Sequence, residues 1–253
     1  MPACPVTRAR TRTVPVAGAA LRVLERGEPG APAVVLLHGG SSSAATWDRL
    51  AAALAAAGRY VIAADLRGHG GSARCAGYPL GGYADDASGL MDALGTGPAA
   101  LAGHSLGGYA AALLAQREPD RVTRLVLEEP GMPPREAGGG HGRRGPRFAL
   151  PALAALAVRR GFDPKAVTAA VRQLRVPDPG WWDRLGLITA PTLLVSGGPA
   201  SHIPARQMAQ AARAIPGARL VTIPAGHRVH SRRPREFLAA VLPFLAGAQA
   251  EGG

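Results

Sequence analysis

One serine in this sequence has the surroundings that a nucleophile needs. Ser105 is the centre of the segment 103–107, which has the pattern G-x-S-x-G. The apolar run before it (99–102) predicts a short buried strand, and the run after it (108–117) predicts a helix. A serine on a sharp turn between strand and helix has a strained backbone and an exposed hydroxyl, and the helix N-terminus faces any negative charge that forms there. These surroundings favour a nucleophile over a glycine-rich turn without chemistry.

The elements that must position this serine alternate along the chain. A hairpin is expected first, over 11–16 and 21–25. Further strands are expected at 33–37, 60–64, 99–102, 122–127, 191–195 and 219–223, and helices at 47–57, 85–94, 108–117, 205–214 and 236–245. This alternation predicts an α/β fold in which helices cover both faces of a mostly parallel sheet.

One stretch interrupts the alternation. Residues 131–185 contain no convincing strand; they hold a glycine run at 138–140, helical patterns at 148–160 and 164–175, and the pair Trp181-Trp182. We interpret them as a small helical insertion that lies over the active end of the sheet. The expected organisation is a core of residues 1–130 and 186–253 with a helical cap of residues 131–185.

Five short segments, taken in their order and spacing, resemble a known family. They are Leu-Leu-His-Gly-Gly at 36–40, Asp-Leu-Arg-Gly-His-Gly-Gly-Ser at 65–72, Gly-His-Ser-Leu-Gly-Gly at 103–108, Asp-Arg-Val at 120–122 and Ala-Gly-His at 225–227. The chain resembles the α/β-hydrolase superfamily, in its branch with a serine nucleophile and a helical cap. The likeness covers nearly the whole chain and is weakest in the insertion, where this superfamily sets its substrates. It implies the α/β-hydrolase fold.

A neutral serine hydroxyl is a weak nucleophile and needs a base within hydrogen-bond reach. His227 follows the last expected strand and precedes the C-terminal helix, which returns it to the carboxyl end of the sheet. Its loop, with Pro234 and Phe237 beyond it, resembles the histidine loop of the family. We therefore expect His227 to act as general base and then as general acid; His230 is the local alternative.

The acid that should orient this histidine lies at an unusual place in the sequence. Hydrolases of this kind carry the acid between serine and histidine along the chain, yet no carboxylate occurs between Asp183 and Glu236. The remaining candidates are Glu128 and Glu129, which point to opposite sides of an extended segment, so that at most one faces His227. The resemblance favours Glu129. Glu128 stays an alternative, as does the interpretation that both are solvated loop charges.

Two backbone N–H groups are expected to form an oxyanion hole. One belongs to Leu106, directly after the serine, and the other to Gly40, where the absence of a side chain lets substrate approach the backbone. Trp181 and Trp182 are candidates for lining a substrate pocket, although packing in the insertion is the alternative for at least one of them.

Composition limits the partners. The net charge is +12, and Lys165 is the only lysine, so the charge is almost entirely arginine. The basic clusters are not interleaved with aromatic residues and no nucleic-acid motif accompanies them, so we expect no nucleic-acid partner.

Two cysteines are too few for a metal site or a disulfide framework. With no apolar leader and no membrane-spanning run, the sequence predicts a cytoplasmic protein without membrane partners, whose oligomeric state is open.

Together these features predict a cofactor-independent serine hydrolase that requires no metal. An acyl-enzyme would form at Ser105 and be released by water that His227 activates. The apolar insertion favours a small, largely apolar carboxylic ester, lactone or thioester as the small-molecule substrate. Relatives that open epoxides or displace halide carry aspartate in place of the serine, which disfavours those reactions. Hydrolysis of a carbon–carbon bond in ring-cleavage products, and a receptor-like relative that binds a ligand with feeble turnover, are the alternatives.

Overall fold

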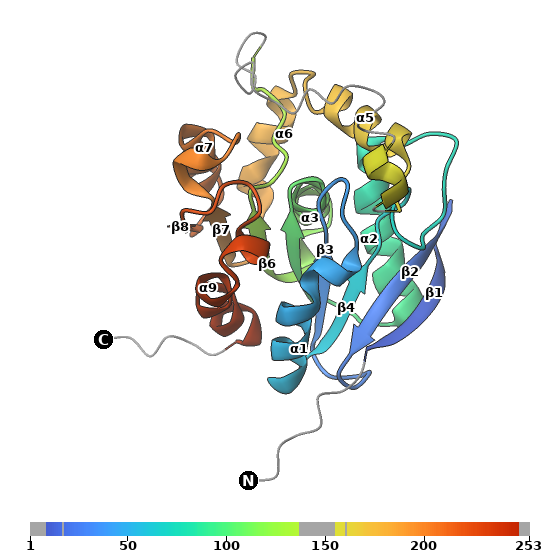
Figure 1. Cartoon of the computed structure of the whole chain (residues 1–253). Coiled ribbons are helices and arrows are strands. Elements are labelled where there is room, and N and C mark those ends of the chain that lie inside the picture. Colours follow the sequence, from blue (N-terminus) through green and yellow to red (C-terminus); the bar gives the residue numbers. More distant parts are fainter. Residues whose placement is uncertain (1–8, 17, 137–154, 160, 248–253) are drawn as a thin grey trace.

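The computed structural model describes residues 9–16, 18–136, 155–159 and 161–247. In these residues the strands form one eight-stranded sheet in the order β1-β2-β4-β3-β5-β6-β7-β8 (Figure 1). The strands are β1 (Arg10–Val16), β2 (Ala19–Arg26), β3 (Ala33–Leu37), β4 (Tyr60–Ala64), β5 (Ala99–His104), β6 (Val122–Glu128), β7 (Thr192–Ser196) and β8 (Arg219–Thr222).

Most neighbouring strands of the sheet are parallel. Along the sheet from β4 through β3, β5, β6 and β7 to β8, each strand runs parallel to its neighbour. Strand β2, by contrast, is antiparallel to both β1 and β4. The predicted α/β fold with a mostly parallel sheet is therefore confirmed. Since β3, β5, β6, β7 and β8 are parallel, their carboxyl ends lie at one edge of the sheet, where sites form in folds of this class.

The burial of the strands explains their composition. Every residue of β3 and β4 is buried, as expected for continuous apolar strands that are covered on both faces. In β2, by contrast, buried residues alternate with partly exposed ones, at Leu21, Val23 and Glu25. This alternation is typical of a strand with one solvated face, and the strand order places the hairpin of β1 and β2 at the margin of the sheet.

Helices cover the sheet on both faces, as the sequence predicts. One core cluster packs α2 and α3 against one face, and a second packs α1 and α9 against the other. The α-helices are α1 (Asp48–Ala56), α2 (Leu80–Leu94), α3 (Leu106–Arg117), α5 (Pro164–Gln173), α6 (Pro179–Asp183), α7 (Ala205–Ala214), α8 (Val229–Arg232) and α9 (Pro234–Ala246). Single 3-10 turns are η1 (Ala44–Trp47), η2 (Pro119–Arg121), η3 (Arg184–Leu187) and η4 (Gly198–Ala200).

The largest difference from expectation is the start of α2, at Leu80 instead of residue 85. Gly81 and Gly82 disfavour a helix intrinsically, so this turn looks like a loop in the sequence. Packing overrides that preference: a Cβ atom at Gly82 would lie only 3.0 Å from the guanidinium of Arg67. That guanidinium forms two hydrogen bonds with Asp86, one turn further along α2, and so fixes the helix at this point.

The described part of the insertion is mostly helical. It contains α5, α6 and a helical turn at 155–159, and α5 and α6 lie beyond the carboxyl ends of the strands (Figure 1). The described residues of 131–185 form no strand, apart from a single bridge between Phe162 and His69. The expected helix at 148–160 lies mostly outside the described residues, and the glycines at 138–140 lie entirely outside them. The division into a core and a cap stays a prediction.

Candidate active site

Ser105 lies on a strained turn between β5 and α3. Its backbone has φ 51° and ψ −111°, a conformation that non-glycine residues adopt only when the surrounding structure enforces it. The enforcement comes from hydrogen bonds: Ser105 N donates to the carbonyl of Glu128 (3.0 Å), and the Ser105 carbonyl accepts from Gly131 N (2.8 Å) and Tyr109 N (2.9 Å). The turn expected from the sequence is therefore present.

The flanking glycines are needed because the chain passes itself closely here. A Cβ atom on Gly103 would overlap the carbonyl of Gly107, and a Cβ atom on Gly107 would overlap the carbonyl of Leu37 in β3. Gly107 N also donates to the carbonyl of His38 (3.1 Å), which joins the start of α3 to the end of β3. The G-x-S-x-G spacing thus meets a packing requirement at this turn.

The loop after β8 brings His227 to the same edge of the sheet. The carbonyl of His227 lies 2.7 Å from Nε2 of His104, the residue before Ser105, and the two rings have centroids 4.8 Å apart. His227 retains 23% side-chain exposure, so a small molecule can reach it. The structure therefore brings this histidine beside the turn that carries Ser105.

Glu129 holds the other side of that histidine. Its Oε2 lies 3.3 Å from Nδ1 of His227, and its side chain is fully buried. Gly197 N donates to Oε1 (2.6 Å), and the hydroxyl of Ser201 donates to Oε2. Its backbone φ of 46° shows that the position is also conformationally constrained. Burial raises the pKa of Glu129, although the hydrogen bonds from Ser201 and Gly197 oppose that effect.

Glu128, the alternative acid, contacts the other histidine of the same loop. His230 donates its backbone N–H to Glu128 Oε1 (3.0 Å), and its Nδ1 lies 2.6 Å from Oε2. The hydroxyl of Thr46 lies 2.7 Å from Nε2 of His230, which extends this chain of polar groups to a partly buried residue. Burial alone would raise the pKa of Glu128, but His104 and the hydrogen bonds from His230 lower it.

The two glutamates therefore point to opposite sides, as predicted: Glu129 holds His227 and Glu128 holds His230. An extended backbone is not the cause, because β6 ends at Glu128 and the backbone at Glu129 is left-handed. Both are fully buried, which excludes the interpretation that they are solvated loop charges. The pairing of Glu128 with His230 is not anticipated from the sequence. The contact joins the end of β6 to α8, two segments that no local pattern relates.

The expected oxyanion hole has two available donors. The backbone N–H groups of Gly40 and Leu106 form no hydrogen bond with any residue that the structure describes. A Cβ atom on Gly39 would lie 3.2 Å from Cβ of Ser105, so the 38–40 segment passes directly beside the serine. These observations fit the predicted role of Gly40 and Leu106, which stays a prediction.

Two other histidines near the site are structural. His38 is fully buried, and its Nε2 accepts a hydrogen bond from Leu66 N (3.0 Å). Burial lowers the pKa of His38 to about 3, and burial likewise lowers the pKa of His104 to about 3. Both side chains are therefore neutral in the folded protein across the physiological pH range.

The lowered pKa values predict how stability depends on pH. A histidine that is buried in its neutral form stabilises the folded protein fully at pH values above its unfolded pKa of about 6.5. As pH falls from there towards the folded pKa, protonation of the histidine in the unfolded state removes this contribution. We expect the free energy of unfolding, measured by urea titration, to fall between pH 7.5 and pH 4.5. His38→Gln should make this slope shallower while lowering stability at pH 7.5. An unchanged slope in the variant would contradict the assignment.

The tryptophans differ in their surroundings. Trp181 is almost fully buried, stacks on Tyr109 of α3 with centroids 6.1 Å apart, and accepts a hydrogen bond at its carbonyl from Gln116 (3.1 Å). These contacts favour the packing alternative for Trp181. Trp182 donates from Nε1 to the carbonyl of Pro133 (2.8 Å) and lines a pocket beside α7. A contact of either with substrate stays a prediction.

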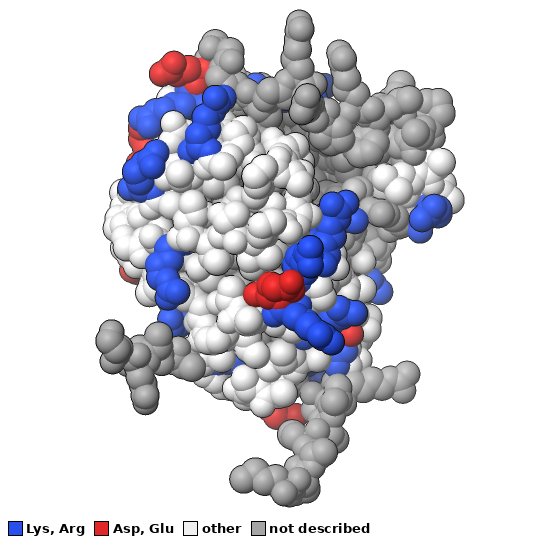
Figure 2. Space-filling view, turned by 60° about the vertical axis from the view of Figure 1, so that its left-hand side comes forward, with Lys and Arg blue, Asp and Glu red and all other residues white. Residues whose placement is uncertain are grey.

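Charge and metal-binding chemistry add few constraints. Figure 2 shows lysine and arginine side chains in separate groups across one face, divided by uncharged surface. Among the described residues, no group of His, Cys, Asp and Glu side chains could hold a metal ion. The helices in the described part of the chain are all too short or too polar to cross a membrane. The cytoplasmic location stays a prediction.

Comparison with known proteins places this arrangement in context. Residues 32–162 match the family described as alpha/beta hydrolase fold. The chain is 30% identical to the sn-1-specific diacylglycerol lipase ABHD11 of Mus musculus, in a match that covers 96% of this chain and 92% of the mouse protein. It is 29% identical to an esterase of Mycobacterium tuberculosis, over 85% of this chain and 83% of the esterase.

Solved structures show the same similarity. The enol-lactonase from Burkholderia xenovorans superposes with a TM-score of 0.75 and is 26% identical, covering 92% of this chain and 99% of its own. A hydrolase from Pseudomonas aeruginosa superposes with a TM-score of 0.77 at 27% identity, over 94% and 98%. These four relatives are hydrolases, and three of them are named as a lipase, an esterase and a lactonase.

Proposed function

This chain belongs to the α/β-hydrolase family, and from that premise we propose that it is a serine hydrolase of small carboxylic esters, lactones or thioesters that needs no cofactor. The activities named for its relatives support hydrolase chemistry on an ester or a lactone. The observation that carries the finer proposal is the contact of Glu129 with His227, beside the strained turn of Ser105. A serine activated by a histidine that a carboxylate orients is suited to acyl transfer.

In the proposed first half-reaction, Ser105 Oγ attacks the carbonyl carbon while Nε2 of His227 takes the hydroxyl proton. The carbonyl oxygen becomes an oxyanion and accepts hydrogen bonds from the N–H groups of Gly40 and Leu106. When the tetrahedral intermediate collapses, the bond to the leaving oxygen or sulfur breaks and His227 gives its proton to the leaving group. The product of this step is an acyl-enzyme at Ser105.

In the second half-reaction, His227 takes a proton from water, whose oxygen attacks the acyl carbon. Collapse releases the carboxylic acid and returns the proton to Ser105. Glu129 accepts a hydrogen bond from Nδ1–H of His227 throughout, which keeps the ring in the required tautomer and stabilises its charged form. The hydrogen bonds that Glu129 receives from Gly197 and Ser201 hold the carboxylate in place for this task.

A panel of 4-nitrophenyl esters of increasing acyl length tests the proposal. We expect turnover with the shorter or intermediate chains, and an initial burst of nitrophenol in proportion to enzyme wherever deacylation is slower than acylation. Lactones and thioesters of the same acyl groups extend the panel to the other expected bonds. Stoichiometric binding of the esters without turnover would favour the receptor alternative instead, and no reaction with any of the compounds would contradict the proposal.

The rate should depend on pH through the general base. Because the base must be neutral to accept a proton, and histidine ordinarily has a pKa of about 6.5, kcat/KM should rise with pH through an apparent pKa of about 6 to 7. The burial that raises the pKa of Glu129 works in the same direction, since protonation of that carboxylate on the acidic side also removes activity. Steady-state kinetics in constant-ionic-strength buffers check this, and a flat profile between pH 5 and pH 8 would contradict a histidine base.

A further inference from the structure

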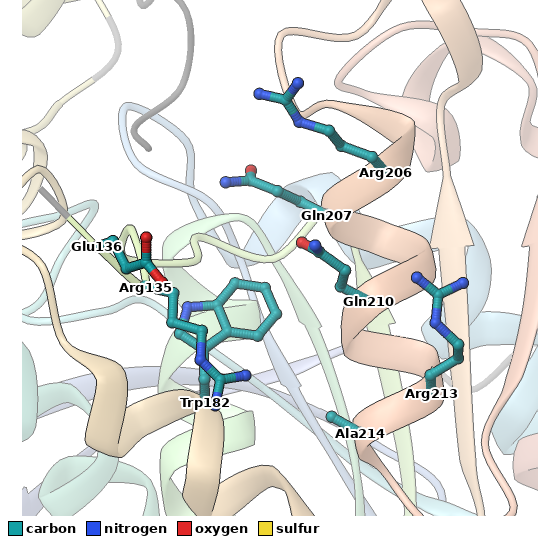
Figure 3. A pocket seen from close by; sticks show the side chains of 8 residues that line it. All are labelled: Arg135, Glu136, Trp182, Arg206, Gln207, Gln210, Arg213 and Ala214. Carbon is teal, nitrogen blue, oxygen red and sulfur yellow. The ribbon is translucent and has the colours of Figure 1, made fainter. Parts of the chain in front are cut away.

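A pocket of about 490 Å³ lies between α7 and the segment that follows Glu129. Figure 3 shows its lining: Gln207 and Gln210 extend from α7 towards Trp182 and Arg135 on the other side, and Arg206 extends over the same space. The full lining consists of Arg135, Glu136, Trp182, Arg206, Gln207, Gln210, Arg213 and Ala214. The pocket thus has an aromatic wall and several polar side chains.

The lining of this pocket carries a net positive charge. Three arginines and one glutamate line it. Arg135 is paired with Asp183 at 2.7 Å, whereas Arg206 and Arg213 form no ion pair with any residue that the structure describes. Guanidinium groups bind carboxylates and phosphates through two parallel hydrogen bonds. The pocket is therefore suited to an anionic group.

One polar residue of the lining adds a second, independent requirement. Gln207 is only 5% exposed, and its Oε1 has no hydrogen-bond partner among the described residues. A buried carbonyl oxygen without a partner carries a free-energy cost, which a ligand with a hydroxyl or amide N–H can remove once the amide turns towards the pocket that its side chain lines. The ligand that satisfies both features carries an anionic group and a hydrogen-bond donor near it.

Each side of the pocket continues from a segment that is bonded to Ser105 or to Glu129. On one side, the backbone N–H of Gly131 is bonded to the Ser105 carbonyl, and Arg135 follows four residues later. The Cα atoms of Gly131 and Arg135 therefore lie at most about 14 Å apart. On the other side, Ser201 donates to Glu129 and α7 begins at Ala205. These short connections place both walls of the pocket on segments that extend from the proposed site.

We propose that this pocket binds the remote end of the substrate, and that this end carries a carboxylate or phosphate with a neighbouring hydroxyl or amide N–H. The inference rests on the proposed ester hydrolysis and narrows its substrate class. The substrate would be apolar at the reacting carbonyl and anionic at its other end. Since Arg206 and Arg213 are exposed, the affinity for the anion should weaken as salt concentration rises.

Kinetics with matched esters test the substrate assignment. The mono-4-nitrophenyl esters of succinic, glutaric, adipic and suberic acids are compared with neutral monocarboxylic esters of equal length. For at least one length we expect the anionic ester to have a lower KM, and the R206Q/R213Q variant to raise that KM about tenfold. The KM of the neutral esters should not change. R235Q, which removes an exposed arginine from α9, is the matched control and should behave as wild type.

Calorimetry tests the pocket without relying on catalysis. sn-Glycerol 3-phosphate and 3-hydroxybutyrate serve as probes for phosphate and carboxylate, with glycerol as the neutral control. Binding of either anion that is lost in R206Q/R213Q but kept in R235Q supports the pocket, even if no ester is hydrolysed and the proposed function fails. Absence of binding by both anions overturns the pocket. Binding without any KM preference among hydrolysed esters overturns its assignment to the substrate.

Discussion

Ser105→Ala is expected to abolish ester hydrolysis, lowering kcat by roughly 10⁵-fold or more. The alanine cannot form an acyl-enzyme, so only the oxyanion donors and substrate binding would remain to accelerate attack by water. The fold should be unaffected, because the backbone bonds that hold the turn come from Glu128, Gly131 and Tyr109 and do not involve the hydroxyl. Steady-state kinetics together with the far-UV circular dichroism spectrum and the melting temperature check this result.

Ser88→Ala is the matched control for that change. Ser88 belongs to α2, and its hydroxyl bonds to Glu118 and Arg121 in a network away from the candidate site. Its loss should leave kcat within about twofold of wild type, since surface changes of this kind have small effects. If Ser105→Ala kept most of the activity, Ser105 would not be the nucleophile.

Glu129→Gln is expected to lower kcat by roughly 10²- to 10⁴-fold. The amide keeps the size of the side chain but removes the charge that stabilises the imidazolium of His227, and it can present its NH₂ group to Nδ1 and so favour the wrong tautomer. KM should change much less, because Glu129 is fully buried and is not expected to contact substrate. Measurement of kcat and KM separately distinguishes this effect from weakened binding.

Two matched variants show whether the effect belongs to Glu129. Glu128→Gln should lower the free energy of unfolding, because Glu128 is buried and bonds twice to His230, but it should lower kcat far less than Glu129→Gln. Asp183→Asn should be close to wild type, since its side chain is exposed and its partner is Arg135. A larger loss of kcat from Glu128→Gln would move the acid by one residue. No loss from either glutamate variant would contradict a triad.

The fold was predictable because strong apolar runs mark its strands. β3 and β4 have the bounds that the sequence predicts, since each is a continuous apolar segment that ends at a polar residue or glycine. The start of α2 was not predictable, because Gly81 and Gly82 are held in a helix by tertiary contacts that local preference opposes. The boundaries thus depend on packing where local propensity is weak.

The candidate site was predictable where residue order along the chain is informative. Ser105, Glu129 and His227 follow parallel strands whose carboxyl ends meet, so their order in the sequence indicates proximity in the fold. The contacts of Ser201 with Glu129 and of His230 with Glu128 join segments that no local pattern relates. The pocket beside α7 is similarly hidden, because Arg135 and Trp182 lie far from α7 in the sequence and only the fold places them around one cavity.

The central claim is that Ser105 is an activated nucleophile, and covalent labelling by a fluorophosphonate tests it most directly. Intact-mass spectrometry should show one adduct per chain, and peptide mapping should place it on Ser105. Labelling should be abolished in Ser105→Ala and slowed strongly in Glu129→Gln, because only a serine with a working base reacts at a useful rate. An adduct on another residue, or no labelling of the folded protein, would contradict the assignment of Ser105 as the nucleophile.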